Sequence, residues 1–127
     1  MHMLEQSLAE LTVLVVDDAP TNLNLLASLL NPMYQVKLAP SGPKALAIAR
    51  KAPPDLILLD VMMPGMDGYE VCRQLKQDEN TRHIPVIFLT AQSDTEDEAR
   101  GFEVGAADFI TKPISPAIVM ARVATHL

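Results

Sequence analysis

Polar residues that could do chemistry follow short apolar runs at several places in this 127-residue chain. They are three carboxylates, a hydroxyl and an ammonium group: Asp17, Asp18, Asp60, Thr90 and Lys112. In an open sheet of parallel strands, ligands bind outside the carboxyl ends of the strands, so these side chains should meet at one edge. Taken singly, each has an ordinary explanation, because Asp and Thr often cap helices or turns and most lysines lie on the surface. Taken jointly, they predict a functional site.

The charges of this set predict both a metal and a reaction. Three converging carboxylates repel one another and raise each other's pKa, and a divalent cation would relieve that repulsion. Oxygen ligands without nearby His or Cys favour Mg2+. One carboxylate could then attack phosphorus while Lys112 and Thr90 stabilise the transferring group. Asp60 is the preferred nucleophile, because a central third strand would place it between the other carboxylates and the Thr90–Lys112 pair.

The elements that would position these residues alternate regularly along the chain. Apolar runs predict strands at 12–16, 35–38, 56–59, 86–89 and 109–110. Apolar residues at helical spacing predict helices at about 23–30, 45–52, 69–75, 94–104 and 115–127. Because strands and helices alternate through short connections, the fold class is α/β, with a parallel sheet covered by helices on both faces.

Composition excludes several classes of protein. A chain of 127 residues with 49% apolar residues is the size of one globular domain and is too apolar for disorder. Sixteen acidic against ten basic residues leave a formal charge of −6. This balance argues against direct nucleic-acid binding, which needs a basic face, and against adhesion to an anionic membrane.

The sequence also predicts a location and a domain boundary. The single cysteine, Cys72, allows no internal disulfide and indicates a reducing compartment. No apolar run approaches the roughly 20 residues needed to span a bilayer, and no signal peptide is visible. We therefore expect a cytoplasmic protein. Residues 1–10 are interpreted as a leader or as residues added in cloning, and 11–127 as the domain.

Four motifs carry a resemblance to a known family. They are the Asp17-Asp18 pair, Asp60 followed by Val-Met-Met-Pro-Gly-Met-Asp-Gly, Thr90-Ala91 and Lys112-Pro113. In these motifs the chain, from about residue 11 to residue 127, resembles the receiver (phosphoacceptor) domain of two-component response regulators. The resemblance implies a flavodoxin-like, doubly wound, three-layer fold with five parallel strands in the order 2-1-3-4-5 and five helices. It also implies that Asp60 accepts a phosphoryl group from a histidine kinase or a histidine phosphotransfer protein.

The resemblance assigns roles to the other site residues. The implied metal ligands are Asp18 and Asp60 directly, Asp17 through water, and the backbone carbonyl of Met62. Thr90 and Lys112 would hold the phosphoryl oxygens, and the peptide bond between Lys112 and Pro113 would be cis. Such a domain catalyses only its own phosphorylation and dephosphorylation. Positions 62 and 92 tune the phosphoryl lifetime in this family, but Met62 and Gln92 favour opposite outcomes, so we predict no lifetime.

Signal output in the family involves a switch pair. Thr90 would move toward the phosphoryl group while Phe109 turns inward. A Phe has no hydroxyl to leave in water, so we expect Phe109 to prefer the inward position. An ordinary core position on the fifth strand is the simpler alternative for this residue.

The family often dimerises through its fourth helix, fifth strand and fifth helix. Asp108 and Arg122 stand where many members place a salt bridge across that surface. A homodimer through it is one possible arrangement, and the sequence does not settle the oligomeric state. The companion Lys and Glu of DNA-binding members are replaced by Glu98 and Ile118. This replacement argues against a dimer of the kind that DNA-binding members form, and against a DNA-binding output. Ile118 or Val119 could instead offer an apolar contact.

The C-terminal segment indicates what the domain could control. It resembles receivers fused to histidine kinases, diguanylate cyclases or cyclic-di-GMP phosphodiesterases. We therefore expect the chain to belong to a larger protein and to act on an output domain or an effector protein. A stand-alone receiver is the alternative.

Other function classes fit the residues less well. A phosphatase of the haloacid-dehalogenase type would need a general-acid Asp two residues after its nucleophile, where Met62 follows Asp60. A flavin-mononucleotide binder would need a Ser-, Thr- and Gly-rich loop in place of the acidic residues after the first strand. A pseudo-receiver, which binds partners but is never phosphorylated, remains the main alternative.

Overall fold

The computed structural model describes residues 10–91 and 95–127, which form five strands and five helices. The strands are β1 (Thr12–Val16), β2 (Gln35–Ala39), β3 (Leu56–Asp60), β4 (Val86–Thr90) and β5 (Asp108–Thr111). The helices are α2 (Pro20–Leu30), α3 (Gly42–Lys51), α4 (Gly68–Gln77), α5 (Thr95–Glu103) and α6 (Pro116–His126). The predicted leader lies outside the described residues, apart from Glu10. None of these helices is long and apolar enough to cross a bilayer.

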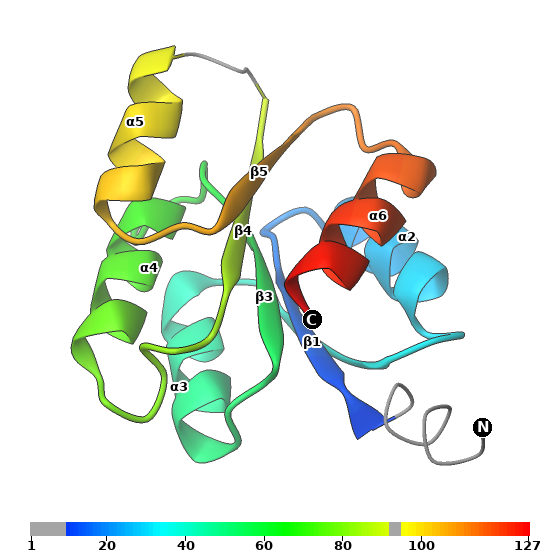
Figure 1. Cartoon of the computed structure of the whole chain (residues 1–127), viewed down its shortest axis with the longest axis horizontal. Helices are drawn as coiled ribbons and strands as arrows, with labels where there is room; N and C mark the ends of the chain where they lie inside the picture. Colours follow the sequence, from blue (N-terminus) through cyan, green and yellow to red (C-terminus); the bar gives the residue numbers. More distant parts are fainter. Residues whose placement is uncertain (1–9, 92–94) are drawn as a thin grey trace.

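The strands form one parallel sheet in the order β2-β1-β3-β4-β5, which confirms the predicted topology. Helices α3, α4 and α5 cover one face of this sheet, and α2 and α6 cover the other (Figure 1). The result is the predicted three-layer α/β/α arrangement, with the carboxyl ends of all five strands at one edge.

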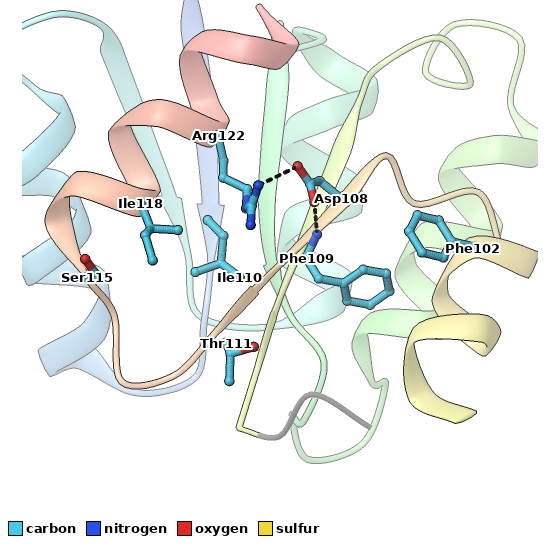
Figure 2. A pocket seen from close by; sticks show the side chains of 8 residues that line it. All are labelled: Phe102, Asp108, Phe109, Ile110, Thr111, Ser115, Ile118 and Arg122. Atoms are coloured by element: carbon cyan, nitrogen blue, oxygen red, sulfur yellow. Dashed lines mark hydrogen bonds and ion pairs between the residues drawn. The ribbon is translucent and has the colours of Figure 1, made fainter. Parts of the chain in front are cut away.

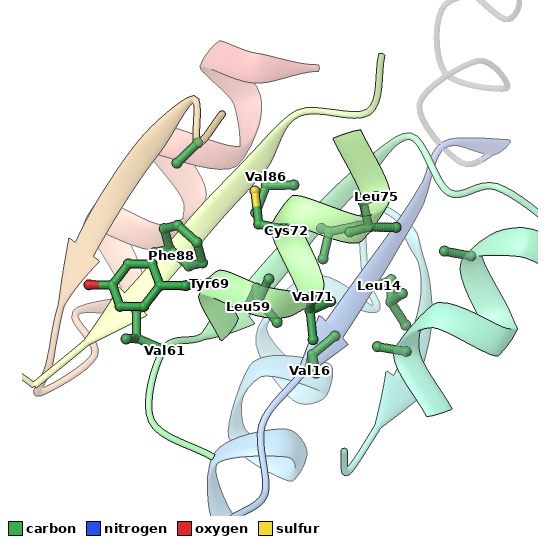
Figure 3. Packing of buried hydrophobic residues seen from close by; sticks show 14 of the residues in the cluster. Leu14, Val16, Leu59, Val61, Tyr69, Val71, Cys72, Leu75, Val86 and Phe88 are labelled. Carbon is green, nitrogen blue, oxygen red and sulfur yellow. The ribbon is translucent and has the colours of Figure 1, made fainter. Parts of the chain in front are cut away.

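Continuous apolar strands are explained by burial on both faces. Successive side chains of a strand point to opposite faces. In β1, Val13 and Val15 pack in the core beneath α2 and α6, whereas Leu14 and Val16 pack in the core beneath α3 and α4. Figure 3 shows the second core, in which side chains of α4 meet those of the strands. Each fully buried Leu, Ile or Val contributes about 1.5–3 kcal/mol.

The helix starts show which polar residues are structural. The Ser41 hydroxyl caps α3 by accepting the N–H of Lys44 at 3.3 Å, and the Asp67 carboxylate caps α4 by accepting the N–H of Glu70 at 2.9 Å. The N-cap residue of α2 is Ala19. The ordinary explanation of Asp17 or Asp18 as the cap of the first helix is therefore wrong, and the Asp17 carboxylate accepts the N–H of Ala19 and the side-chain amide of Asn22.

Gly68 brings the start of α4 against the end of β3. Its N–H donates to the carbonyl of Val61 at 2.9 Å. A Cβ at this position would lie 2.4 Å from the carbonyl oxygen of Asp60 and 2.9 Å from the Cα of Val61. Both neighbours are backbone atoms, which cannot move aside without shifting Asp60. Only glycine allows this approach.

We expect Gly68→Ala to lower the free energy of unfolding by about 1–3 kcal/mol, the usual penalty for overpacking a well-packed site. Urea denaturation followed by circular dichroism measures it. Gly65→Asn is the matched control, because Gly65 has a φ of 77° and open space around its Cβ position. Asn tolerates that backbone conformation, so the control should change stability little. Equal losses in both variants would contradict the close-approach explanation.

Candidate functional site at the carboxyl edge of the sheet

The three predicted carboxylates meet at the carboxyl edge of the sheet. Asp17 follows β1 and Asp60 ends β3, and these two strands are paired. One ligand oxygen from each of Asp17, Asp18 and Asp60 lies within 4.8 Å of the other two. Asp17 is fully buried and Asp60 is 3% exposed, whereas Asp18 is exposed. The cluster therefore joins two buried acids to one that is open to solvent.

Lys112 brings a positive charge to the same place. Its Nζ donates to Oδ1 of Asp60 at 3.2 Å and lies 3.6 Å from Oδ2 of Asp17. Its backbone N–H donates to the carbonyl of Thr90 at 2.7 Å, which joins the segment after β5 to the end of β4. The peptide bond between Lys112 and Pro113 is cis, as expected. One ammonium group thus contacts two carboxylates.

The raised pKa of Asp60 shows that the ammonium of Lys112 does not fully compensate the negative charge of the carboxylates. Burial, and then repulsion by Asp17, raise the pKa of the Asp60 carboxyl to about 6 from its ordinary 3.8. Lys112 and the N–H of Met62, which lies 3.4 Å from Oδ1 of Asp60, act in the opposite direction. An all-oxygen cluster with surplus negative charge suits a hard divalent cation such as Mg2+.

Asn22 is a site residue that the sequence analysis missed. Its Nδ2 donates to Oδ2 of Asp17 at 3.1 Å, while Oδ1 of Asp17 accepts the N–H of Ala19 at 2.9 Å. These bonds hold the buried Asp17 carboxylate in one orientation. Its position could have indicated this role, because Asn22 lies in the first turn of α2, which begins at Pro20 shortly after the end of β1.

Thr90 and Met62 line a pocket of about 330 Å³ beside the acidic cluster. Thr90 is the last residue of β4 and is buried, whereas the side chain of Met62 is 73% exposed. Tyr69 of α4 and Arg100 of α5 line the same pocket. The ligand role of the Met62 carbonyl stays a prediction, and Gln92 lies outside the described residues.

Comparison with known proteins decides the family. A family model described as the response regulator receiver domain matches residues 13–124. The chain belongs to this family. The matched range contains the acidic cluster, the hydroxyl of Thr90 and the ammonium of Lys112.

Curated relatives of this receiver domain are longer proteins. It is 48% identical over 126 residues to a Vibrio cholerae protein named "Probable cyclic di-GMP phosphodiesterase", covering 99% of this chain and 29% of that protein. It is 54% identical over 112 residues to the response regulator PleD of Caulobacter vibrioides, covering 87% of this chain and 25% of PleD. The chain thus spans less than a third of either relative.

Solved receiver structures have the same fold. The chemotaxis protein CheY4 of Vibrio cholerae superposes with a TM-score of 0.90 at 32% identity, covering 94% of this chain and all (100%) of that one. The receiver domain of a histidine kinase from Syntrophus aciditrophicus gives a TM-score of 0.83 at 42% identity, covering 91% and 89%. Both the predicted fold and the predicted family are confirmed.

A second group of predicted residues lies on the receiver's outer surface, formed by α5, β5 and α6. Arg122 Nη1 lies 3.7 Å from Oδ2 of Asp108, within one chain (Figure 2). His126, which the sequence analysis did not single out, places Nε2 3.0 Å from the same oxygen. Burial raises the pKa of Asp108, but His126, the N–H of Phe109 and Arg122 together hold it below its ordinary value.

The same surface contains a pocket of about 290 Å³ between β5 and its two helices. Phe109 lines it but is only 8% exposed, so its ring occupies the inner position. Ile118 is 46% exposed and Val119 is fully buried, so of these two only Ile118 could offer an apolar contact. The side chain of Glu98 lies outside the described residues.

Replacing Asp60 with Asn should stabilise the metal-free domain near neutral pH. The folded state holds the Asp60 proton between pH 3.8 and about 6, where the unfolded chain loses it. The free energy of unfolding of the wild type therefore falls, relative to the variant, as pH rises through this interval. Thermal denaturation in the presence of chelator measures this effect. At pH values above 7 we expect Asp60→Asn to raise the melting temperature by about 3–6 °C, which corresponds to ~1 kcal/mol in the free energy of unfolding. Near pH 4 the increase should be much smaller.

Glu79→Gln is the control for this comparison, because Glu79 is an exposed carboxylate beyond the end of α4. Its melting temperature should follow that of the wild type at each pH. A variant Asp60→Asn that is less stable than the wild type across the whole pH range would contradict the electrostatic explanation.

Proposed function

We propose that this receiver domain is a phosphorylation switch in which Asp60 accepts the phosphoryl group. The observation that supports it most directly is the position of Asp60. It lies at the buried end of β3, within the acidic cluster and 3.2 Å from the ammonium of Lys112. A histidine kinase or a histidine phosphotransfer protein would be the donor.

The transfer needs little covalent chemistry from the protein. A carboxylate oxygen of Asp60 forms a bond to phosphorus as the bond from phosphorus to the donor's imidazole nitrogen breaks, and that nitrogen keeps the electron pair and takes up a proton. Lys112 would neutralise charge on the equatorial oxygens, and the Thr90 hydroxyl would donate to another of them. The buried, hydrogen-bonded Asp17 would hold its charge in place through the reaction.

The donor set fits Mg2+. Three carboxylates offer ligand oxygens within 4.8 Å of one another, and repulsion by Asp17 contributes to the high pKa of Asp60. The proposed ligands are Asp18 and Asp60 directly, Asp17 through water and the Met62 carbonyl. When bound, Mg2+ supplies positive charge that offsets the carboxylates and the incoming phosphoryl oxygens.

The output would pass through Thr90 and Phe109 to the surface formed by α5, β5 and α6. This surface could pair with a second copy or contact an output domain or effector protein. The length of the curated relatives supports a larger protein in which residues 11–127 are the receiver. We place this protein in the cytoplasm, where response regulators generally act. Similarity to a protein named as a cyclic di-GMP phosphodiesterase, and to the receiver of a histidine kinase, supports an enzymatic output. The formal charge of −6 argues against direct nucleic-acid binding by the receiver itself.

Acetyl phosphate provides the direct test. The purified domain is incubated with acetyl phosphate and Mg2+ and its intact mass is measured. We expect the wild type and Glu79→Gln to gain one phosphoryl group, Asp60→Asn to gain none, and chelation of Mg2+ to abolish the gain. The two variants each remove one carboxylate charge, so they separate the role of position 60 from net charge.

No mass gain in the wild type, together with no binding of beryllofluoride, would contradict the switch. The domain would then be a pseudo-receiver that acts only through its surfaces. A gain that persists in Asp60→Asn would instead place the acceptor elsewhere.

Mg2+ alone should stabilise the domain, because a ligand that binds only the folded state raises the free energy of unfolding as RT ln(1 + [L]/Kd). We expect millimolar Mg2+ to raise the melting temperature of the wild type and of Glu79→Gln by about 2–6 °C, and of Asp18→Asn by much less. Differential scanning fluorimetry measures this shift. Equal shifts in all three proteins would show that Asp18 is not a ligand.

A further inference from the structure

Four of the five aromatic residues of this domain form one continuous row. The chain has three Phe and two Tyr, and all three Phe lie in the row with Tyr69. Ring centroids are 5.3 Å apart for Tyr69 and Phe88, 5.7 Å for Phe88 and Phe109, and 5.0 Å for Phe109 and Phe102. The row begins at the pocket that Thr90 lines and ends at the pocket on the outer surface.

Three consecutive residues of α5, the last of them Phe102 itself, lie along this row. The guanidinium of Arg100 lies 4.4 Å from the centre of the Tyr69 ring, and Phe102 packs edge-on against Phe109. Gly101 lies between them. Figure 2 shows Phe102 and Phe109 extending from α5 and β5 toward each other.

Gly101 leaves room for the Phe109 ring. A Cβ at Gly101 would lie 2.3 Å from Cζ and 2.8 Å from Cε1 of Phe109, and 3.1 Å from Cδ2 of Phe88. Phe88 and Phe102 pack against the Phe109 ring, so the ring could give way only toward the outer pocket that it lines. Gly101 is helical and its φ is not positive, so the backbone does not require glycine. Glycine is a poorer helix former than alanine, so the close approach is the physical reason for it here.

We propose that Gly101 is a positioning residue for Phe109, which admits the ring to its inner position and so sets how readily the domain adopts its phosphorylated conformation. This inference rests on the proposed function, in which an inner Phe109 accompanies movement of Thr90 toward the phosphoryl group. Phe109 pairs with Phe88, two residues before Thr90 on the neighbouring strand. A side chain at position 101 would displace the ring toward the outer pocket and disfavour that conformation.

A double-mutant cycle tests the contact. We expect Gly101→Ala to lower the melting temperature in the wild-type background, because its Cβ overlaps the ring. In a Phe109→Ala background the same substitution should raise it, because the overlap is gone and alanine favours the helix. Glu103→Ala, an exposed site on the same helix, should have the same sign in both backgrounds. If Gly101→Ala alone fails to fold, folding of the double variant gives the same answer.

Labelling by acetyl phosphate tests the effect on the switch. We expect Gly101→Ala to label Asp60 at least three-fold more slowly than the wild type, and Glu103→Ala to label at the wild-type rate. Loss of the nuclear Overhauser contacts between the rings of Phe88 and Phe109 in Gly101→Ala should accompany the slower labelling. In the Phe109→Ala background, the substitution at position 101 should leave the rate unchanged.

Two results would overturn the proposal. The first is a melting temperature that rises on Gly101→Ala in the wild-type background, since the ring would then accommodate the Cβ. The second is a lower melting temperature with an unchanged labelling rate, which would reduce Gly101 to a packing role. A wild type that is never labelled would overturn the proposed function itself, whereas the contact between Gly101 and Phe109 would still be decided by the cycle.

Discussion

Repulsion among the carboxylates at the end of β1 and β3 is the constraint on which the rest of the site depends. Asp17 and Asp60 are buried. Among the described residues, the cation that contacts both carboxylates is the ammonium of Lys112. Burial and this repulsion bring the pKa of Asp60 to about 6. A buried acid that is held with too little compensating charge favours a cation, and this is why the cluster suits a hard divalent metal such as Mg2+.

The sheet can tolerate this unfavourable cluster because nearly everything else it buries is apolar. β3 and β4 are buried along their whole length, and the flanking strands add Val and Leu side chains from β1 and Phe109 and Ile110 from β5 to two cores. Two hydrogen bonds and one close backbone approach then limit the freedom of the acids. Asn22 and the N–H of Ala19 hold Asp17, while the close approach of Gly68 to the Asp60 carbonyl holds the end of β3.

The register between β4 and β5 places the site close to the outer surface. Thr90 pairs with Thr111, and Phe88 pairs with Phe109, so the hydroxyl at the site and the buried ring that lines the outer pocket lie two positions apart on paired strands. Helix α5 lies across both through its contacts with Tyr69 and Phe109. A small movement at the end of β4 therefore has a short, closely packed route to α5 and to the surface that it forms with β5 and α6.

The sequence by itself determined the elements and most of the site. Alternating apolar runs and helical spacing predicted the strands and helices within a few residues, and Asp, Thr and Lys at strand ends predicted the shared edge, because parallel strands bring their carboxyl ends together. Only the tertiary structure decided which side chains meet across elements. Asn22 reaches Asp17, His126 reaches Asp108, and Gly101 admits Phe109. Such contacts depend on how helices pack on the sheet to within an ångström, and the spacing of residues along a chain does not carry that distance.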